Sequence, residues 1–244
     1  MKKLKLDTVD STNEYLMREA GNLPAPILVA ARCQTAGHGQ RGNSWESAPG
    51  ENLTFSILFR PEEMQPPLQF YISEAVALAV VDFLAVHGIE AKVKWPNDIY
   101  VGDRKICGIL IRHSLAGEYI SFSVIGVGIN VNQTEFVSDA PNPVSIAMVT
   151  GERYDVDNLY DLVADCIERR LESIGDDDRR SAIHREFMSR LWRGDGAYYP
   201  FTDTATGEHF SAAVDCVSTS GPITLRLADG SFRTYSFKEV SFDI

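Results

Sequence analysis

Apolar residues recur along the first 190 residues with the two periods that distinguish strands from helices. Runs of strand length, either alternating or wholly apolar, predict β-strands at residues 4–9, 27–31, 53–59, 89–95, 99–101, 105–111 and 119–127. Apolar residues at helical spacing predict helices at residues 11–20, 70–87 and 159–171. We therefore expect a chain that mixes both kinds of element.

Polar residues mark the ends of several of these elements. Ser11 and Glu14 have the spacing of a capping box before the first helix, and Gly21 follows that helix. Gly102-Asp103 separates two short strands and predicts a two-residue hairpin turn of type II′. The charged residues 176–180 interrupt the apolar pattern, so we expect a solvated loop there.

The pattern of predicted elements changes after Trp192. Short strand-like runs alternate with turn signals at Thr206-Gly207, Gly221-Pro222 and Asp229-Gly230. This pattern predicts a small all-β unit of about fifty residues, most simply a barrel. We therefore expect two domains, at residues 1–190 and 191–244.

Composition and charge narrow the class of protein. Of 244 residues, 44% are hydrophobic and 23% charged, so the chain can bury a core without disulfides or a structural metal. The four cysteines include no C-x-x-C pair, and the first residues lack the apolar run of a secretory signal. The net charge of −11 is unlike that of a duplex-DNA-binding protein. We expect a cytoplasmic protein that contacts neither nucleic acid nor membrane.

A glycine-rich loop follows the strand at residues 27–31. Residues 37–42 match the dinucleotide fingerprint G-x-G-x-x-G, but Pro49 and Gly50 prevent the helix that this motif must open. A phosphate-binding P-loop also fails, because Asn43 stands where the motif needs lysine. Two interpretations remain: a loop whose backbone N–H groups approach a ligand closely, or a mobile surface loop.

The segment Lys94-Trp95-Pro96-Asn97-Asp98 leaves an alternating strand and leads into the predicted hairpin. A two-residue turn would pair Tyr100 with Lys105, Ile99 with Ile106, Asp98 with Cys107 and Asn97 with Gly108. Asp98, Tyr100, Lys105 and Cys107 would then share one face, where a carboxylate able to hold Mg²⁺ meets an ammonium. Taken singly, Asp98 also fits turn chemistry, and Lys105 an exposed hairpin lysine.

Residues 126–130, Gly-Val-Gly-Ile-Asn, end the strand that follows. Two glycines at a strand end suit a crevice where a ligand meets backbone, and Asn130 can hydrogen-bond a phosphate or a ribose. Alternatively, the glycines mark a β-bulge.

Together, these segments resemble the biotin–protein ligase family. Five of its motifs stand here in the family's order: D-S-T-N at residues 10–13, the glycine-rich loop with its tryptophan at 37–45, K-W-P-N-D at 94–98, K-x-x-G-I-L at 105–110 and G-x-G-I-N at 126–130. The agreement extends from about residue 4 to residue 150. The tail resembles the family's C-terminal SH3-like domain more weakly.

The resemblance implies an α+β fold: a mixed β-sheet catalytic domain of the biotin/lipoate ligase type, like that of class II synthetases, with a small C-terminal SH3-like β-barrel. It implies that ATP, with Mg²⁺, activates biotin to biotinyl-5′-AMP. The biotin is then transferred to a lysine of a biotin carboxyl carrier protein domain. A homodimer is compatible with the resemblance.

The same resemblance implies roles for individual residues. Those expected to bind biotin are Ser11, Thr12, Asn13, Gln34, Gly37, His38, Gly39, Gln40, Trp45, Lys105 and Gly108. Those expected to bind ATP are Gly37, His38, Gly39, Gln40, Arg41, Trp45, Lys94, Asn97, Lys105 and Asn130. Lys105, Arg41 and Lys94 are expected to act in catalysis and Asp98 to hold the metal. Because two anions must meet, such a site needs cations and backbone donors that offset their repulsion.

The sequence departs from the family's loop at two positions. His38 replaces the usual arginine and Gln40 stands where several relatives have arginine, so the loop carries less charge. A lipoate or octanoate ligase is one rival, although K-W-P-N-D and G-x-G-I-N fit biotin ligases better. A non-catalytic biotin-binding protein is the other, supported only by the reduced charge. Some family members begin with a DNA-binding domain; this sequence begins at the catalytic strand, so we expect no repressor function.

Overall fold

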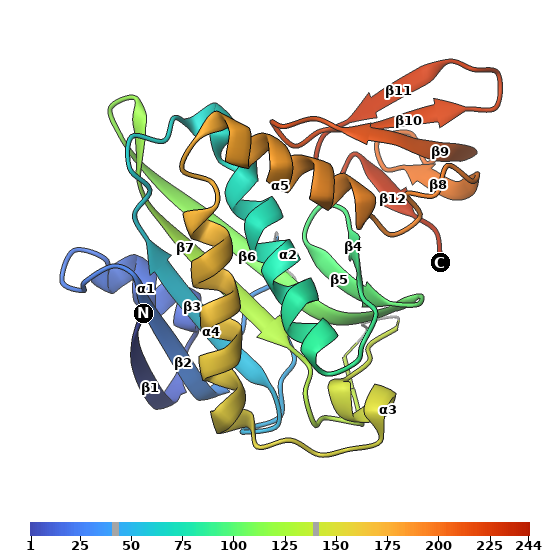
Figure 1. Ribbon diagram of the computed structural model, residues 1–244. Helices are drawn as coiled ribbons and strands as arrows, with labels where there is room; N and C mark the ends of the chain where they lie inside the picture. Colours follow the sequence, from blue (N-terminus) through green and yellow to red (C-terminus); the bar gives the residue numbers. More distant parts are fainter. Residues whose placement is uncertain (41–43, 139–141) are drawn as a thin grey trace.

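The computed structural model describes residues 1–40, 44–138 and 142–244, which form two β-sheets and several helices (Figure 1). The strands of the larger sheet are β1 (Lys2–Val9), β2 (Ile27–Gln34), β3 (Leu53–Phe59), β4 (Lys92–Lys94), β5 (Asp98–Val101), β6 (Arg104–Ala116) and β7 (Tyr119–Ile129). Those of the smaller sheet are β8 (Tyr199–Asp203), β9 (His209–Val217), β10 (Ile223–Leu227), β11 (Phe232–Tyr235) and β12 (Val240–Phe242). The helices are α1 (Thr12–Glu19), η2 (Pro66–Leu68, a 3₁₀ turn), α2 (Phe70–Val86), α3 (Ile146–Thr150), α4 (Val156–Glu172) and α5 (Asp177–Ser189).

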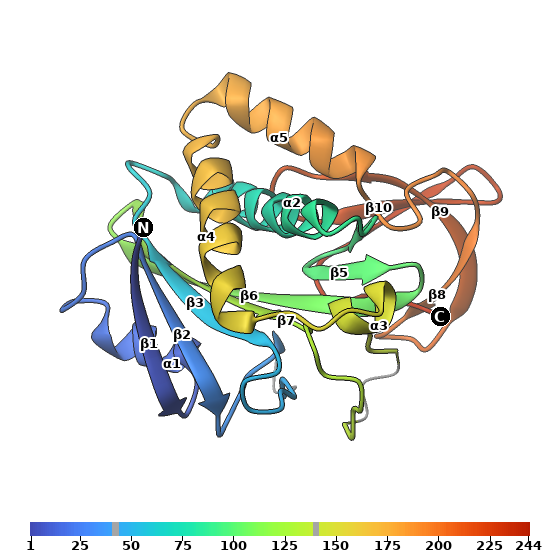
Figure 2. The ribbon, with the colours of Figure 1, turned by 60° about the horizontal axis from the view of Figure 1, so that its bottom comes forward.

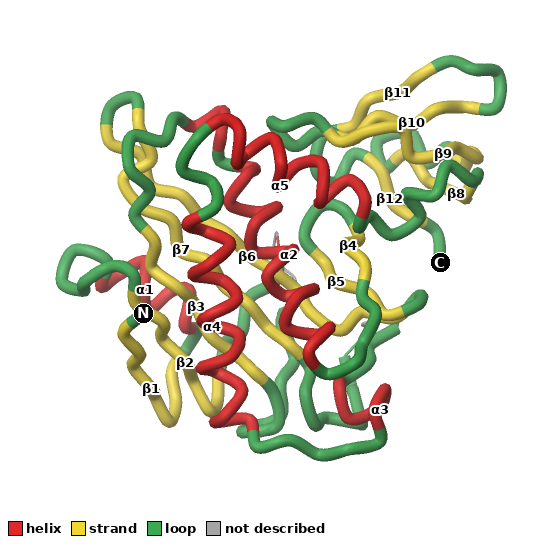
Figure 3. Tube along the Cα trace, viewed as in Figure 1, coloured by secondary structure: helices red, strands yellow, loops and turns green. Residues whose placement is uncertain are grey.

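The larger sheet is mixed, with the strand order β1-β2-β3-β7-β6-β5-β4. Only β1 and β2 are parallel among its neighbouring strands, and the remaining pairs are antiparallel. Helices and sheet together form the α+β arrangement that the sequence predicts (Figure 3).

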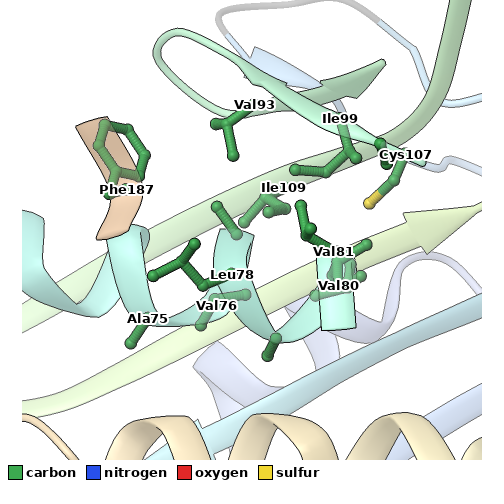
Figure 4. Close-up of a cluster of buried hydrophobic side chains, with 14 of the residues drawn as sticks. Ala75, Val76, Leu78, Val80, Val81, Val93, Ile99, Cys107, Ile109 and Phe187 are labelled. Atoms are coloured by element: carbon green, nitrogen blue, oxygen red, sulfur yellow. The ribbon is translucent and has the colours of Figure 1, made fainter. Parts of the chain in front are cut away.

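Helices α2 and α4 cover one face of the larger sheet, and α5 packs on α2 (Figure 2). Val76, Leu78 and Val81 of α2 meet Ile99 and Ile109 of the sheet in the hydrophobic core, and these five side chains are at most 5% exposed (Figure 4). Burying each such side chain contributes roughly 1.5–3 kcal/mol, so this layer supplies much of the fold's stability. Residues 66–86 have the length and mean hydropathy (1.6) of a membrane span, but 67% of that window is buried inside the protein, as in a core helix.

Helix α1 lies against the opposite face of the sheet, where Leu16 packs on β2, β3 and β7. Ser11 is its N-cap, as predicted, and its hydroxyl accepts a hydrogen bond from the backbone of Asn13. The predicted capping box is wrong in its second hydrogen bond, from the backbone N–H of Ser11 to the side chain of Glu14. Glu14 instead pairs with Arg112 at 2.5 Å, and the backbone N–H of Ser11 donates to Asp10.

The hairpin between β5 and β6 corrects the predicted register. Gly102 takes the positive φ (57°) that the turn needs, and Tyr100 pairs with Lys105 as expected. A β-bulge at Ile106 then shifts the pairing by one residue, so that Ile99 faces Cys107 and Asp98 faces Gly108. The predicted pairs of Ile99 with Ile106, Asp98 with Cys107 and Asn97 with Gly108 are therefore wrong. Cys107 therefore points into the core with Ile99 (Figure 4).

Two other expectations for local structure are wrong. The strand predicted at 89–95 is shortened to β4, because residues 89–91 connect α2 to the sheet without pairing in it. The charged residues 176–180 begin α5 and do not form a loop. Asp176 caps that helix by accepting from Arg179, and Asp177 and Asp178 stand in its first turn, where carboxylates favour the helix dipole.

The smaller sheet confirms the predicted all-β unit after Trp192. Its order is β11-β10-β9-β8-β12, and no β11–β12 pair closes a ring within the described residues. It is packed firmly on the larger sheet. The indole of Trp95 donates to the carbonyl of Gly221 at 2.8 Å and lies 5.4 Å from the ring of Phe237, and one hydrophobic cluster spans both sheets.

Candidate active site

A cavity of about 850 Å³ opens on the sheet face opposite α2 and α4. The residues predicted to bind ligand or metal that line it are Ser11, Thr12, Asn13, Gln34, His38, Gly39, Gln40, Trp45, Lys94, Asn97, Asp98, Lys105, Gly108 and Asn130. Gly37 does not belong to this wall but supports it, because its carbonyl accepts from the backbone of Trp45 at 2.9 Å. Arg41 lies outside the described residues.

Neutral hydrogen-bonding groups gather at the end of the cavity beside α1. The carbonyl oxygen of the Gln34 side chain accepts from the backbone of Thr12 (2.8 Å) and from its hydroxyl (3.1 Å). That hydroxyl also lies 2.8 Å from the hydroxyl of Ser56. Asn13 donates to the carbonyl of Leu110, but its own side-chain oxygen is buried and has no hydrogen-bond partner among the described residues. The N-terminus of α1 adds its positive dipole end here.

Glycines form the floor of the middle of the cavity. The indole of Trp45 lies directly on β6 and β7: a Cβ added to Gly128 would stand 2.3 Å from it, and one added to Gly108 would stand 3.1 Å from it. Gly126 leaves similar room for Asn13, whose amide nitrogen would be 3.0 Å from an added Cβ. These positions accept no side chain without displacing the cavity wall, which explains the two glycines that the sequence places at the end of β7.

Charged groups gather at the end of the cavity beside β4 and β5. The ammonium of Lys105 pairs with the carboxylate of Asp98 at 2.8 Å, which confirms that the two groups converge. Lys94 stands opposite Asp98 in the β4–β5 backbone register, and the charge of Asp98 acts on it. Its ammonium lies 5.2 Å from the ring of Tyr100 and 5.3 Å from that of Phe242. Burial lowers the pKa of Lys94. Two ammonium groups therefore face one carboxylate, an arrangement suited to an incoming anion.

Two asparagines stand beside these charges. Asn97 donates to the carbonyl of Ile109 at 2.6 Å. Asn130 donates to the carbonyl of Val144 at 3.0 Å, and its side-chain oxygen is buried with no partner in the part of the chain that the structure describes. Like Asn13, it offers an acceptor to a bound molecule, since buried polar atoms are normally hydrogen-bonded.

The residues fit a metal that arrives with phosphate better than one held by protein alone. In residues 1–40, 44–138 and 142–244, no group of three or more His, Cys, Asp or Glu side chains could hold a metal ion. Asp98 is therefore not part of a cluster of three or more such ligands among the described residues. Mg²⁺ is commonly bound through one or two carboxylates together with substrate phosphates, so this donor set is compatible with it.

Several wall residues were missed by the sequence analysis. Ser56 could have been found, because Thr54 and Ser56 are the polar members of an otherwise apolar strand and both line the cavity. Phe242 belongs to β12 of the smaller sheet and Lys238 to the turn before that strand. Lys238 donates to the backbone carbonyl of Gln40 at 3.4 Å. No local pattern announces these two, because their proximity depends on how the sheets pack.

Comparison with known proteins agrees with this geometry. Residues 6–130 match the family model described as the biotin/lipoate A/B protein ligase family. The chain is 29% identical to the biotin–[acetyl-CoA-carboxylase] ligase of Paracoccus denitrificans over 231 residues, which cover 91% of this chain and 92% of that protein. It is 33% identical to the bifunctional ligase/repressor BirA of Bacillus spizizenii over 171 residues, or 67% of this chain and 52% of that protein.

A solved structure shares the whole fold. The biotin protein ligase from Aquifex aeolicus in complex with biotin and ATP superposes with a TM-score of 0.77 and 24% identity, covering 99% of this chain and 98% of that one. By contrast, the chain spans about half the length, or less, of the first curated relatives it matches.

Proposed function

Because this chain belongs to the biotin/lipoate A/B protein ligase family, we propose that it is a biotin–protein ligase that works in two steps. A biotin carboxylate oxygen bonds to the α-phosphorus of ATP while the bond to the β-phosphate oxygen breaks, giving biotinyl-5′-AMP and pyrophosphate. A carrier lysine amine then bonds to the biotinyl carbonyl, AMP leaves with the electron pair, and the amine loses a proton.

The observation behind this proposal is that one cavity joins a neutral polar end to a cationic end across a glycine floor. The neutral end, formed by Ser11, Thr12, Asn13 and Gln34, offers both donors and acceptors, which matches a ureido head group. The apolar tail of octanoate or lipoate would leave the buried oxygen of Asn13 without a partner. This contrast favours biotin over a fatty acyl substrate.

At the other end, Lys105 and Lys94 are positioned to offset the charge of the carboxylate and the α-phosphate as the two anions approach. Lys105 must exchange its contact with Asp98 for the incoming anion. Mg²⁺ bound by Asp98 would supply further positive charge to the triphosphate. Asn97 and Asn130 lie within the same wall and would orient the nucleotide.

The activity named for one relative supports the acceptor class. The Paracoccus denitrificans relative is a biotin–[acetyl-CoA-carboxylase] ligase, so we propose a carboxyl carrier domain of a biotin-dependent carboxylase as acceptor. We further propose a catalytic domain at residues 1–190 and a second domain at 191–244 that completes the cavity wall. The four cysteines are free thiols, which fits action in the cytoplasm.

Pyrophosphate exchange tests the proposal directly. The purified chain with Mg²⁺ should exchange labelled pyrophosphate into ATP when biotin is added. Parallel reactions with lipoate and with octanoate should show no exchange above background. Exchange with lipoate or octanoate alone would assign the chain to the rival ligases. Biotin binding by calorimetry without any exchange would make it a sequestering protein.

A further inference from the structure

The side chain of Glu46 joins two separate segments of the cavity wall. One carboxylate oxygen accepts from the backbone of Val137 (3.0 Å) and from the side chain of Gln133 (3.1 Å). The other accepts from the backbone of Ser138 (2.8 Å) and again from Val137 (3.2 Å). Together they satisfy two consecutive backbone donors, Val137 and Ser138, which lie 91 and 92 residues further along the chain.

Among the described residues, the segment at residues 134–138 has one polar restraint besides Glu46: the side chain of Gln133 donates to the carbonyl of Glu135 at 2.9 Å. Val137 is 92% exposed, so the segment gains little from burial. Its near end is fixed by Gln133, whose amide oxygen accepts from Asn52 at 2.6 Å. Beyond that anchor, the contacts to Glu46 restrain the backbone, and hydrogen bonds to an ionised carboxylate are among the stronger ones.

Both joined segments face the cavity. Trp45, next to Glu46, has its indole on Gly108 and Gly128, while Phe136 lines the cavity from the other segment. Burial would raise the pKa of Glu46, but the hydrogen bonds from Ser138, Val137 and Gln133 outweigh it and lower that pKa below its ordinary value. The carboxylate is therefore ionised at neutral pH, and it can hold both aromatic walls at once.

We infer that Glu46 is a positioning residue: its carboxylate clasps the 133–138 segment to the Trp45 segment, so that the two aromatic walls close on a bound adenylate together. This inference rests on the proposed function for the identity of the ligand alone, because the contacts that define the clasp do not depend on it. Glu46 need touch no reacting atom to slow release of the intermediate.

Glu46→Gln tests the clasp with little change in shape. A carboxamide has one acceptor oxygen, and its NH₂ group would meet a backbone N–H, so at least part of the clasp is lost. Glu51→Gln is the matched control, because Glu51 pairs with Arg153 at 2.9 Å and does not belong to the described cavity wall. Glu46→Asp keeps the charge and should restore part of the effect.

Two measurements decide the outcome. In hydrogen exchange followed by mass spectrometry without ligand, Glu46→Gln should raise the exchange rate of residues 133–138 about tenfold. In a chase experiment, biotinyl-AMP formed on the enzyme should dissociate about tenfold faster from Glu46→Gln, with unchanged thermal stability and unchanged values in Glu51→Gln.

The two measurements also separate this inference from the proposed function. Unchanged exchange at residues 133–138 would overturn the clasp. Faster exchange with unchanged adenylate release would overturn the positioning role and leave a purely structural contact. If the wild-type protein forms no adenylate, the proposed function fails, while the exchange result still reports on the clasp.

Discussion

The strands β3 and β7 present different side chains to the two faces of the larger sheet. On the face covered by α2 and α4 they place Phe55, Ile57, Ile125 and Val127, and on the opposite face Thr54, Ser56, Gly126 and Gly128. Large apolar side chains pack closely on the covered face, so no room is left there for a ligand. The open face is made of small and polar groups, which leave space and hydrogen-bonding partners.

The open face itself changes along the strands. Leu58 and Val124 pair beneath α1, where Leu16 covers them, and only further along do Ser56 and Gly126 open the cavity. The helix that seals one part of this face thus also brings its own N-terminus to the cavity's edge. The difference teaches that the site occupies the part of the sheet left without a packing layer.

Phe83→Ala should produce the largest effect, on stability. Phe83 is fully buried in α2 on the covered face, and removing such a ring typically costs about 3–5 kcal/mol. Urea unfolding should show this loss, whereas Val86→Ala, at a position 64% exposed on the same helix, should stay within about 0.5 kcal/mol of wild type. Biotin affinity of the folded Phe83→Ala protein should be unchanged. A large loss of affinity would mean that the two faces are not independent.

Lys105→Ala, on the open face, should have the opposite effect: activity should fall while stability is kept. Removing a charge that stabilises a transition-state phosphate typically costs about 100-fold in rate, or about 2.7 kcal/mol. Adenylation, measured by pyrophosphate exchange, should fall by that factor with the fold intact. Lys5→Ala removes an ion pair of similar length, Lys5 with Asp157 at 2.7 Å, at the far edge of the sheet and should change nothing. Activity of Lys105→Ala within a few-fold of wild type would make Lys105 a bystander.

Local signals in the sequence predicted much of the fold. The bounds of β3, the cap at Ser11 and the turn at Gly102 follow from short-range preferences, and the structure confirms all three. The bulge at Ile106 has no such signal, because an inserted residue in an apolar run changes no local pattern. Asp98 and Lys105 still meet, because the bulge leaves the pairing of Lys105 with Tyr100 intact.

The residues of the cavity wall also divide into those that local sequence signals predict and those that they do not. Residues within the five motifs could be predicted to lie near a ligand because they share segments with glycines or strand ends. Phe242 and the 133–138 segment could not be predicted there. Phe242 reaches the wall through packing between the sheets, and the segment is held there by hydrogen bonds to Glu46. The predicted loop at the start of α5 is wrong because acidic residues occur both in loops and in the first turns of helices.

Glu74 is a polar residue on the mostly apolar covered side of the sheet. It is fully buried in α2, and its carboxyl group is hydrogen-bonded to the ring of His184 at 2.6 Å. Burial raises the pKa of Glu74 to about 8, from about 4.5 in the unfolded chain. The native protein therefore keeps a proton that the unfolded chain releases, so stability falls as pH rises from 4.5 through 8.

Glu74→Gln cannot ionise and should escape that loss. Its stability relative to wild type should increase between pH 6.5 and pH 8 by on the order of 1 kcal/mol, measured by urea unfolding at both values. Glu62→Gln, at an exposed position, is the control and should show no such change. A relative stability independent of pH would contradict a neutral Glu74 in the native protein.

Phe242→Leu should have the smallest effect and tests where the open face ends. Lys94 stands on the edge strand β4, and the smaller sheet supplies the ring of Phe242, 5.3 Å from its ammonium. Leucine preserves apolar volume but not the ring's attraction for a cation, which is worth about 0.5–1 kcal/mol. The KM for ATP should therefore rise about two- to fivefold in pyrophosphate exchange with little change in kcat.

Phe232→Leu is the matched control for this last prediction, because Phe232 is 57% exposed on the same small sheet. If Phe242→Leu and Phe232→Leu both keep the wild-type KM for ATP, the smaller sheet serves only to pack against the core around Trp95. The ligand-binding face would then end at β4. A rise in KM confined to Phe242→Leu would instead mean that the smaller sheet extends that face. The ring of Phe242 would then position Lys94 at β4, where the larger sheet ends.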